Sequence, residues 1–267
     1  MPTYRLTIEY NGAKFAGWQA QASARTVQGV LLDALRGITG EPNLDLQGAG
    51  RTDAGVHALA QVASLRCRGV LKRERVLETL ERELPSDVAV LDLIPAPTAF
   101  HARHDAVARA YVYQITRRRS AFGKRVSWWV RERLDVARMA EAAAHFVGRH
   151  DVRAFTKRAS EKDSTVVQVD RCEVSEADDC VLVTMVASHF LWNQVRRTVG
   201  ALVTVGRAES APEDVAAWLS RTAPPPALAA PAAGLFLAAV RYPNEPWNAL
   251  PIAPIALPMS HRSRRTC

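Results

Sequence analysis

The amino-acid sequence predicts an α+β fold with two similar halves, in which helices pack on a mostly antiparallel sheet. Strand and helix patterns fall into two groups, strand–helix–strand–helix–strand and then strand–helix–strand–strand–helix–helix–strand. Pro95 and Pro97 interrupt the periodicity between the groups, which places the seam near residues 95–104. No short repeat of the kind that builds a solenoid is present, so two compact halves suit a chain of 267 residues.

The first group begins with a strand at residues 3–10, where aromatic or aliphatic side chains alternate with polar ones. Thr26 is expected to cap a helix, because apolar side chains from Val27 to Ile38 follow the helical period before Gly40. The remaining elements of this group are a strand through 61–65, a helix that carries Leu77, Leu80 and Leu84 and stops before Pro85, and a strand at 88–94.

The second group begins with a strand on which Arg109, Tyr111 and Tyr113 share one face. A helix is expected from about Asp135, with Gly148 as the glycine that follows its C-terminus. The remaining elements are strands at 166–174 and 181–187 joined by an acidic turn at 176–179, an amphipathic helix with apolar positions from Leu191 to Val203, a short helix around Trp218, and a strand at 235–242.

These groups define three predicted regions. Residues 1–103 form an N-terminal α+β half that includes a glycine-rich loop around Asp53, and residues 104–247 form a C-terminal α+β half. Residues 248–267 form a tail rich in proline and arginine, which we expect to be loosely packed.

The balance of charge favours a polyanionic partner. Thirty-five Lys and Arg residues against 27 Asp and Glu residues give a net charge of +8. Nucleic acid is the first expectation and an acidic membrane surface the second. Most of the positive charge comes from arginine, which binds phosphate through two parallel hydrogen bonds and stacks on bases.

Membrane and metal sites are disfavoured. The most apolar stretch, 227–240, is broken by Pro231 and Gly234 and is shorter than the roughly 20 residues that span a bilayer. The four cysteines are scattered, without the close spacing of a zinc site or a secretory context for disulfides. We therefore expect a cytoplasmic protein with reduced thiols, no membrane segment and no metal.

The segment from Gly48 to His57 gathers several reactive or charged groups. Its sequence, GAGRTDAGVH, places the cation of Arg51 and the carboxylate of Asp53 among three glycines, which permit close approach by a ligand. The residues alone leave open a simple turn with an aspartate cap. A phosphate cradle lacks the lysine of a P-loop, and Gly55 argues against a helix that presents Asp53 and His57 to zinc.

This segment resembles the G-x-G-R-T-D-x-G-V-H-A motif of the tRNA pseudouridine synthase A family. Further blocks similar to those of the family occur in the family's order, over nearly the whole chain from Tyr4 to Tyr242. Departures at Asn11, in the late-helix stretch 190–196 (FLWNQVR, where a Met-Val-Arg ending is commoner) and at 224–233 remove no charged residue of the site. The similar blocks are 10–19 (YNGAKFAGWQ), 26–28 (TVQ), 100–103 (FHAR), 109–113 (RAYVY), 190–191 with 195–196 and Gly200, and 234–237 (GLFL).

The resemblance implies an isomerase, an intramolecular transferase that converts uridine in tRNA to pseudouridine in a central RNA-binding cleft. Asp53 is its implied catalytic residue, either as a nucleophile at C1′ or as a base that takes a proton from the ribose. The resemblance also implies that Arg196 pairs with Asp53 and that Tyr111 stacks on the uracil, with its hydroxyl helping to remove the C5 proton. Arg51 is expected to insert where the flipped base left its stack, or to bind phosphate.

The implied substrate is the anticodon stem-loop of tRNA, around nucleotides 38 to 40. The implied assembly is a homodimer without a cofactor. From the residues alone, Arg196 suits a phosphate or surface contact, Arg51 a structural pair with another carboxylate, and Tyr113 an ordinary half-buried tyrosine. His57 and His101 are expected to fix loops through hydrogen bonds rather than to act as acids or bases.

Two other functions remain open. A non-catalytic basic RNA-binding protein has the same charge but tolerates Asp53→Ala. A carboxylate-dependent hydrolase of nucleosides or glycosides usually needs a second carboxylate as its acid. No second acidic residue stands in a comparably glycine-flanked setting, so the hydrolase is the weaker alternative.

Overall fold

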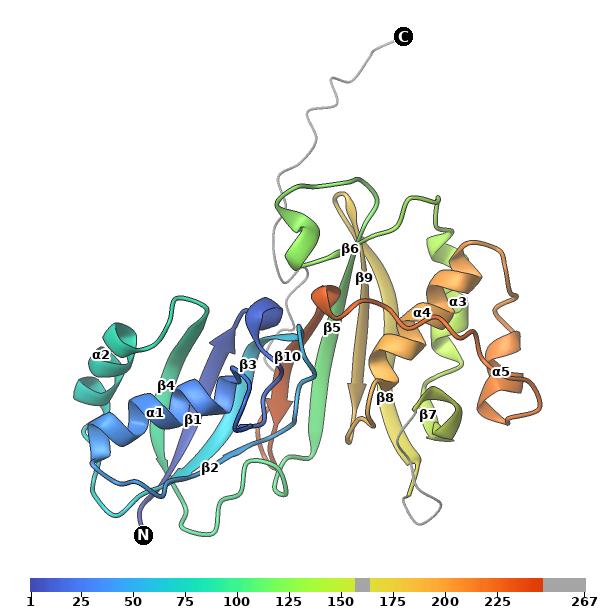
Figure 1. Cartoon of the computed structure of the whole chain (residues 1–267). Helices are drawn as coiled ribbons and strands as arrows, with labels where there is room; N and C mark the ends of the chain where they lie inside the picture. Colours follow the sequence, from blue (N-terminus) through green and yellow to red (C-terminus); the bar gives the residue numbers. More distant parts are fainter. Residues whose placement is uncertain (157–163, 247–267) are drawn as a thin grey trace.

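The computed structural model describes residues 1–156 and 164–246, and its first elements follow the predicted order with additions (Figure 1). The strand β1 (Thr3–Tyr10) and the helix α1 (Val27–Thr39) begin where the sequence periods place them. The Thr26 side chain caps α1 as predicted, because its Oγ1 accepts a hydrogen bond from Gly29 N at 3.2 Å. The other elements are η1 (Gly12–Lys14), β2 (Asp45–Gly48), β3 (His57–Arg66), α2 (Arg73–Glu83) and β4 (Val88–Ala96).

The second group contains the predicted elements and several short ones. The strand β5 (Ala108–Thr116) is buried along its whole length, and the helix α3 (Val136–Ala144) is capped by Asp135, which accepts from Arg138 N at 3.1 Å. The other elements are η2 (Gly123–Arg125), β6 (Trp128–Trp129), β7 (Gly148–Asp151), η3 (Arg153–Phe155), β8 (Val166–Ala177), β9 (Cys180–Ala187), α4 (Gln194–Gly206), α5 (Asp214–Leu219), η4 (Ala232–Gly234) and β10 (Leu235–Arg241).

Some details of the second group differ from the prediction. The helix α3 ends at Ala144, and Gly148 is not the glycine after its C-terminus; with φ +120°, Gly148 opens β7 and pairs with Val169. Tyr113 is fully buried rather than half-buried, and its hydroxyl donates to Pro231 O at 2.7 Å. The predicted tail at 248–267 lies outside the described residues.

Ten strands of the described residues form one sheet, in the order β4-β1-β3-β10-β5-β9-β8-β7, with β2 paired to β3 and β6 paired to β5. Neighbours within these residues are antiparallel except β10 with β3 and β5 with β6. The predicted α+β fold with a mostly antiparallel sheet is confirmed.

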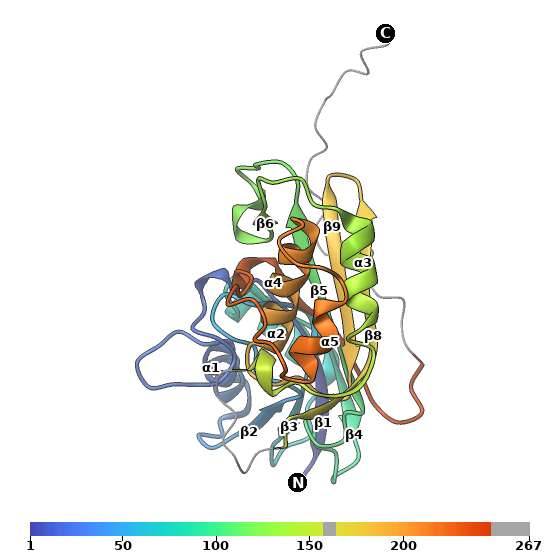
Figure 2. The same cartoon turned by 90° about the vertical axis from the view of Figure 1, so that its right-hand side faces the viewer.

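The last strand joins the two groups of elements. β10 lies between β3 and β5, so the sheet continues from one group into the other. Side chains from all five described α-helices share one hydrophobic core with one face of the sheet, and Figures 1 and 2 show the helices gathered around it. The division of the chain at residues 103 and 104 remains a prediction.

A membrane-spanning helix and a cluster of metal-binding side chains are both absent from residues 1–156 and 164–246. No helix in this part of the chain combines the length and the apolar character needed to cross a bilayer. No group of three or more His, Cys, Asp and Glu side chains there is arranged to hold a metal ion. Cys67, Cys172 and Cys180 are buried and free.

Candidate active site

The glycine-rich loop connects two paired strands. β2 ends at Gly48 and β3 begins at His57, and the antiparallel pairing of β2 with β3 fixes both ends of the loop that includes Asp53. After Asp53 the chain turns, with Gly55 at φ +78° and Val56 N donating to Asp53 O at 3.1 Å. The backbone on both sides of Asp53 is therefore held by hydrogen bonds of the sheet and the turn.

The residues that follow β1 pack on this loop. Trp18 N donates to Thr52 O at 3.0 Å, and Gly12 N donates to His57 Nδ1 at 3.1 Å. A Cβ atom at Gly12 would lie 1.9 Å from Val56 O, so a larger residue there would force the backbone apart. The opening block of the sequence therefore serves as a support for the Asp53 loop, and the loop-fixing role predicted for His57 is confirmed.

A buried hydrogen-bond network supports the same loop from β1 and β3. The Tyr10 hydroxyl lies 2.7 Å from Thr52 Oγ1, and Gln61 Nε2 donates to Gly50 O at 2.8 Å. Burial raises the pKa of Tyr10 well above 10, so its phenol stays neutral. The residues just before Asp53 are thus tied to β1 and β3 through the side chains of Tyr10 and Gln61.

Arg109 links the loop to the second group of elements. Its guanidinium is buried on β5 and donates to four backbone oxygens. These belong to Ala49 at 3.0 Å, Arg103 at 2.6 Å, Ala106 at 2.9 Å and Ser188 at 2.9 Å. Burial lowers the pKa of Arg109 from its usual high value. Ala49 lies in the Asp53 loop and Ser188 precedes the segment that enters α4, so one cation holds both walls of the space between them.

A cavity of about 780 Å³ lies between these walls, larger than the two others described, of about 540 and 430 Å³. Its lining comes from the residues after β1, from the Asp53 loop, from β5 and from the segment that enters α4. Arg51, Asp53, Tyr111 and Arg196 all line it. The fold therefore brings together the four residues that the sequence predicts for the site, and their individual roles remain predictions.

Tyr111 forms part of the cavity wall and is 9% exposed. Its ring meets Phe190 edge-on, with the ring centroids 5.1 Å apart. Burial, and next the nearby Tyr10 and Asp53, raise the pKa of Tyr111 well above 10. The phenol is therefore neutral at physiological pH, and it can donate a hydrogen bond or stack on a base.

The two predicted arginines differ in setting. Arg196 lies in the first turn of α4, where its Nε donates to Ala230 O at 2.7 Å and its Nη1 donates to Asn193 Oδ1 at 2.9 Å. This guanidinium is held in place, and its pairing with Asp53 remains a prediction. Arg51 is exposed and forms no ion pair with another described residue. The alternative that Arg51 pairs with a carboxylate to stabilise the fold therefore finds no support among these residues.

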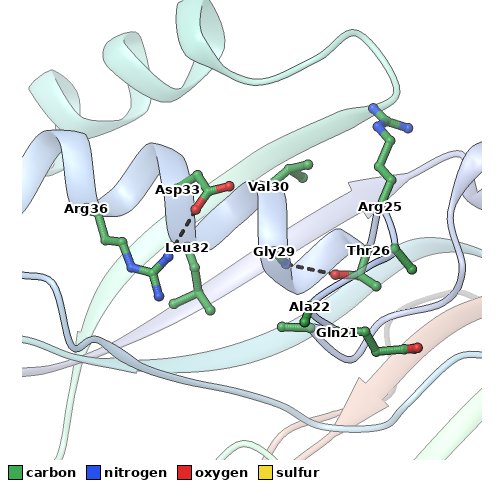
Figure 3. Close-up of a pocket in the computed structure, with 11 residues that line it drawn as sticks. Gln21, Ala22, Arg25, Thr26, Gly29, Val30, Leu32, Asp33 and Arg36 are labelled. Atoms are coloured by element: carbon green, nitrogen blue, oxygen red, sulfur yellow. Dashed lines mark hydrogen bonds and ion pairs between the residues drawn. The ribbon is translucent and has the colours of Figure 1, made fainter.

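The cavity of about 540 Å³ runs along α1 and has a different chemistry (Figure 3). Its arginines already bind acidic neighbours. Arg36 Nη1 donates to Asp33 Oδ1 at 3.0 Å, as Figure 3 shows. Arg25 makes two hydrogen bonds to Asp87. It contains none of the four predicted site residues. We therefore place the candidate site in the larger cavity.

Sequence reasoning missed the role of Arg109 and the network around Tyr10. A signal for Arg109 was present, because it is the one charged residue on a strand of mostly apolar and aromatic side chains, and a charged residue is rarely buried unless its donors are satisfied. Tyr10, Thr52 and Gln61 offer no such signal. They meet only because β1 pairs with β3, which no local pattern encodes.

Comparisons with known proteins confirm the resemblance. A family model described as tRNA pseudouridine synthase matches residues 6–105 and 142–243. The chain is 40% identical over 248 residues to a tRNA pseudouridine synthase A of Xanthobacter autotrophicus. This alignment covers 91% of this chain and 100% of that protein. Over 247 residues it is 40% identical to the protein of the same name from Moorella thermoacetica, again with 91% and 100% coverage. The chain belongs to the tRNA pseudouridine synthase family.

Proposed function

We propose that the chain is a tRNA pseudouridine synthase that isomerises uridine to pseudouridine in the anticodon stem-loop, around nucleotides 38 to 40. One observation supports this most strongly. Arg51, Asp53, Tyr111 and Arg196 come from three separate parts of the chain and line a single cavity. The relatives named tRNA pseudouridine synthase A give the same expectation for the substrate class.

The reaction moves one glycosidic bond. The bond between C1′ and N1 of uridine breaks, the base turns, and C1′ bonds to C5, whose proton is lost while N1 gains one. The carboxylate of Asp53 can attack C1′ and leave again, or it can take a proton from the ribose so that a glycal forms. Both routes require Asp53 to be ionised when the uridine arrives, and they stay open.

Tyr111 is the proposed platform for the uracil. An aromatic ring gains about 1–3 kcal/mol per stacked base, which offsets much of the few kcal/mol needed to flip a nucleotide out of its stack. The raised pKa of Tyr111 favours a neutral phenol over a phenolate base. Its hydroxyl therefore assists removal of the C5 proton as a neutral hydrogen-bonding group.

The arginines have complementary proposed roles. Arg196, held by Ala230 and Asn193, supplies a fixed cation that keeps the carboxylate of Asp53 ionised against the effect of burial under a base. Arg51, exposed at the cavity, fills the space left by the flipped base or binds a phosphate. We further propose a cytoplasmic homodimer in which two subunits share one tRNA, as the resemblance implies.

The decisive experiment is to incubate the protein with unmodified tRNA and to map pseudouridine by chemical labelling. The proposed function predicts labelled sites in the anticodon stem-loop and no change in the mass of the RNA. Release of free uracil would instead identify a hydrolase. Unmodified RNA that is nevertheless bound, with the same affinity for the Asp53→Ala variant, would identify a binding protein without catalysis.

A further inference from the structure

The segment between β5 and α3, residues 117–133, combines positive charge with exposed aromatic side chains. Seven of its residues are Arg or Lys and one is acidic. Phe122 is 82% exposed and Trp129 is 43% exposed, and the Arg119 guanidinium lies 5.9 Å from the centre of the Trp129 ring. Cations beside exposed rings form a surface suited to phosphates and bases together.

Most of these cations are available to a partner. Arg117 and Arg118 pair with Glu176 and Asp179 of the neighbouring hairpin. The other five are exposed and form no ion pair with any residue in 1–156 or 164–246. They are Arg119, Lys124, Arg125, Arg131 and Arg133.

The segment lies close to the candidate active site. A Cβ at Gly55 in the Asp53 loop would lie 3.2 Å from Ala232 Cβ of η4, and η4 contacts η2 of this segment. Figure 1 shows the green segment above the red turn that leads into β10, and Figure 2 shows it on the side of the sheet where the helices lie. A cavity of about 780 Å³ holds only a small part of a tRNA, so the remainder must run over surfaces next to it.

We propose that residues 117–133 form a second tRNA-contact surface, with the five free cations on phosphates and Phe122 and Trp129 stacked on unpaired bases. This inference rests on the proposed function for the identity of the RNA. A second copy of the chain is the less suitable occupant, because two copies of this patch facing each other across a two-fold axis repel. Unpaired bases, in contrast, offer a flat face to each exposed ring.

The test compares two triple variants of the full chain. Lys124→Ala, Arg131→Ala and Arg133→Ala together remove three cations from the segment. Arg68→Ala, Lys72→Ala and Arg75→Ala together remove three exposed cations near the start of α2, as the control. The affinity for tRNA is measured over a range of salt concentrations, and kcat is measured at saturating tRNA.

The plot of log affinity against log salt concentration has a negative slope, and each lost phosphate contact makes it shallower by about 0.7 to 0.9. We therefore expect the slope of the first variant to be shallower by about 2. Its kcat at saturation stays unchanged, and the control variant keeps the slope of the original chain. Phe122→Ala is expected to weaken tRNA binding about fivefold or more at fixed salt with the slope unchanged, because an uncharged ring releases no counterions.

An unchanged slope and affinity in the first variant, with unfolding temperature and kcat also unchanged, overturns the inference and leaves the proposed function standing. Dissociation of an oligomer by the same variant, seen by sedimentation with tRNA affinity intact, also overturns it, since the surface then binds protein. Slope loss as expected, in a protein that forms no pseudouridine, supports the contact surface while the proposed function fails.

Discussion

Arg109 Nη2 donates a hydrogen bond to Ala49 O at 3.0 Å, which ties the central strand β5 to the loop that includes Asp53. The same guanidinium donates to Ser188 O at 2.9 Å, ahead of the segment with Arg196. These two backbone segments form opposite walls of the cavity. The distance between the walls therefore depends on one buried cation, which we regard as a positioning residue.

Arg109→Lys is expected to lower both stability and rate. An ammonium cannot reproduce the planar fork that reaches four oxygens, and hydrogen bonds to a charged group are worth about 1.5–3 kcal/mol each, so we expect a loss of about 2–3 kcal/mol. At a temperature where the variant is folded, kcat should fall at least tenfold while tRNA affinity changes little. Thermal unfolding and single-turnover assays measure these effects. Arg138→Lys is the control, because the Arg138 side chain donates to one carbonyl, that of Ser210. Equal losses of kcat in Arg109→Lys and Arg138→Lys would contradict the positioning role.

Asp53→Asn is expected to abolish isomerisation and to leave tRNA binding nearly intact. The amide has the shape of the carboxylate but neither its charge nor its nucleophilicity, so both proposed routes stop. Asp33→Asn, an exposed carboxylate on α1, serves as the control and should keep full activity. Chemical mapping of pseudouridine and a filter-binding assay provide the two readouts. Measurable turnover by Asp53→Asn would refute its catalytic role.

Tyr111→Phe is expected to keep tRNA binding and to lose rate, because the stacking face remains while the hydroxyl is removed. The raised pKa of Tyr111 means that the phenol stays protonated through the neutral and mildly alkaline range. Ionisation of the phenol should therefore contribute nothing to the rate between pH 8 and pH 10. The pH profiles of the original chain and of Tyr111→Phe should have the same shape over this range. Tyr113→Phe, which loses the bond to Pro231 O, is the control for hydroxyl loss on the same strand face. Unchanged turnover of Tyr111→Phe would remove its hydroxyl from the mechanism.

The long elements could be predicted because their signals are local. Alternation in β1 and the helical period of α1 depend only on neighbouring residues, and both were placed within a residue or two. The strands β2, β6 and β7 span four residues or fewer, so no period is visible, and their existence depends on distant partners. The insertion of β10 between β3 and β5 is likewise a property of tertiary pairing.

The candidate site likewise includes residues that could be predicted from the sequence and contacts that could not. Motif resemblance could select Asp53 and Arg196, which are far apart in sequence and line one cavity, whereas the residues alone left Asp53 as a possible turn cap. His57 and His101 were correctly predicted to fix loops, since their Nδ1 atoms accept from Gly12 N and Arg103 N. The four oxygens bound by Arg109 could not be predicted, because carbonyl positions follow from the complete fold.

His57 makes stability depend on pH. Burial lowers the pKa of His57 below 6.5, so between 6.5 and that lower value the unfolded chain binds a proton that the folded chain does not. The free energy of unfolding should therefore fall as the pH drops from 7 to 5. His57→Asn keeps an acceptor for Gly12 N and removes the titration, so its unfolding temperature should fall less over this range. A slope equal to that of the original chain would show that His101 and His189, whose pKa values burial also lowers, account for the whole effect.

Two glycine substitutions test how tightly the opening block supports the Asp53 loop. Gly12→Ala places a methyl group 1.9 Å from Val56 O, and overpacking of this kind costs about 1–3 kcal/mol. Because Gly12 N also holds His57, the forced shift reaches the loop, and kcat should fall along with the unfolding temperature. Gly37→Ala adds the same methyl group inside α1 with nothing within 4 Å, and should raise stability by about 0.5–1 kcal/mol with kcat unchanged. If Gly12→Ala keeps both its unfolding temperature and its kcat, the contact between this block and the loop does not position Asp53.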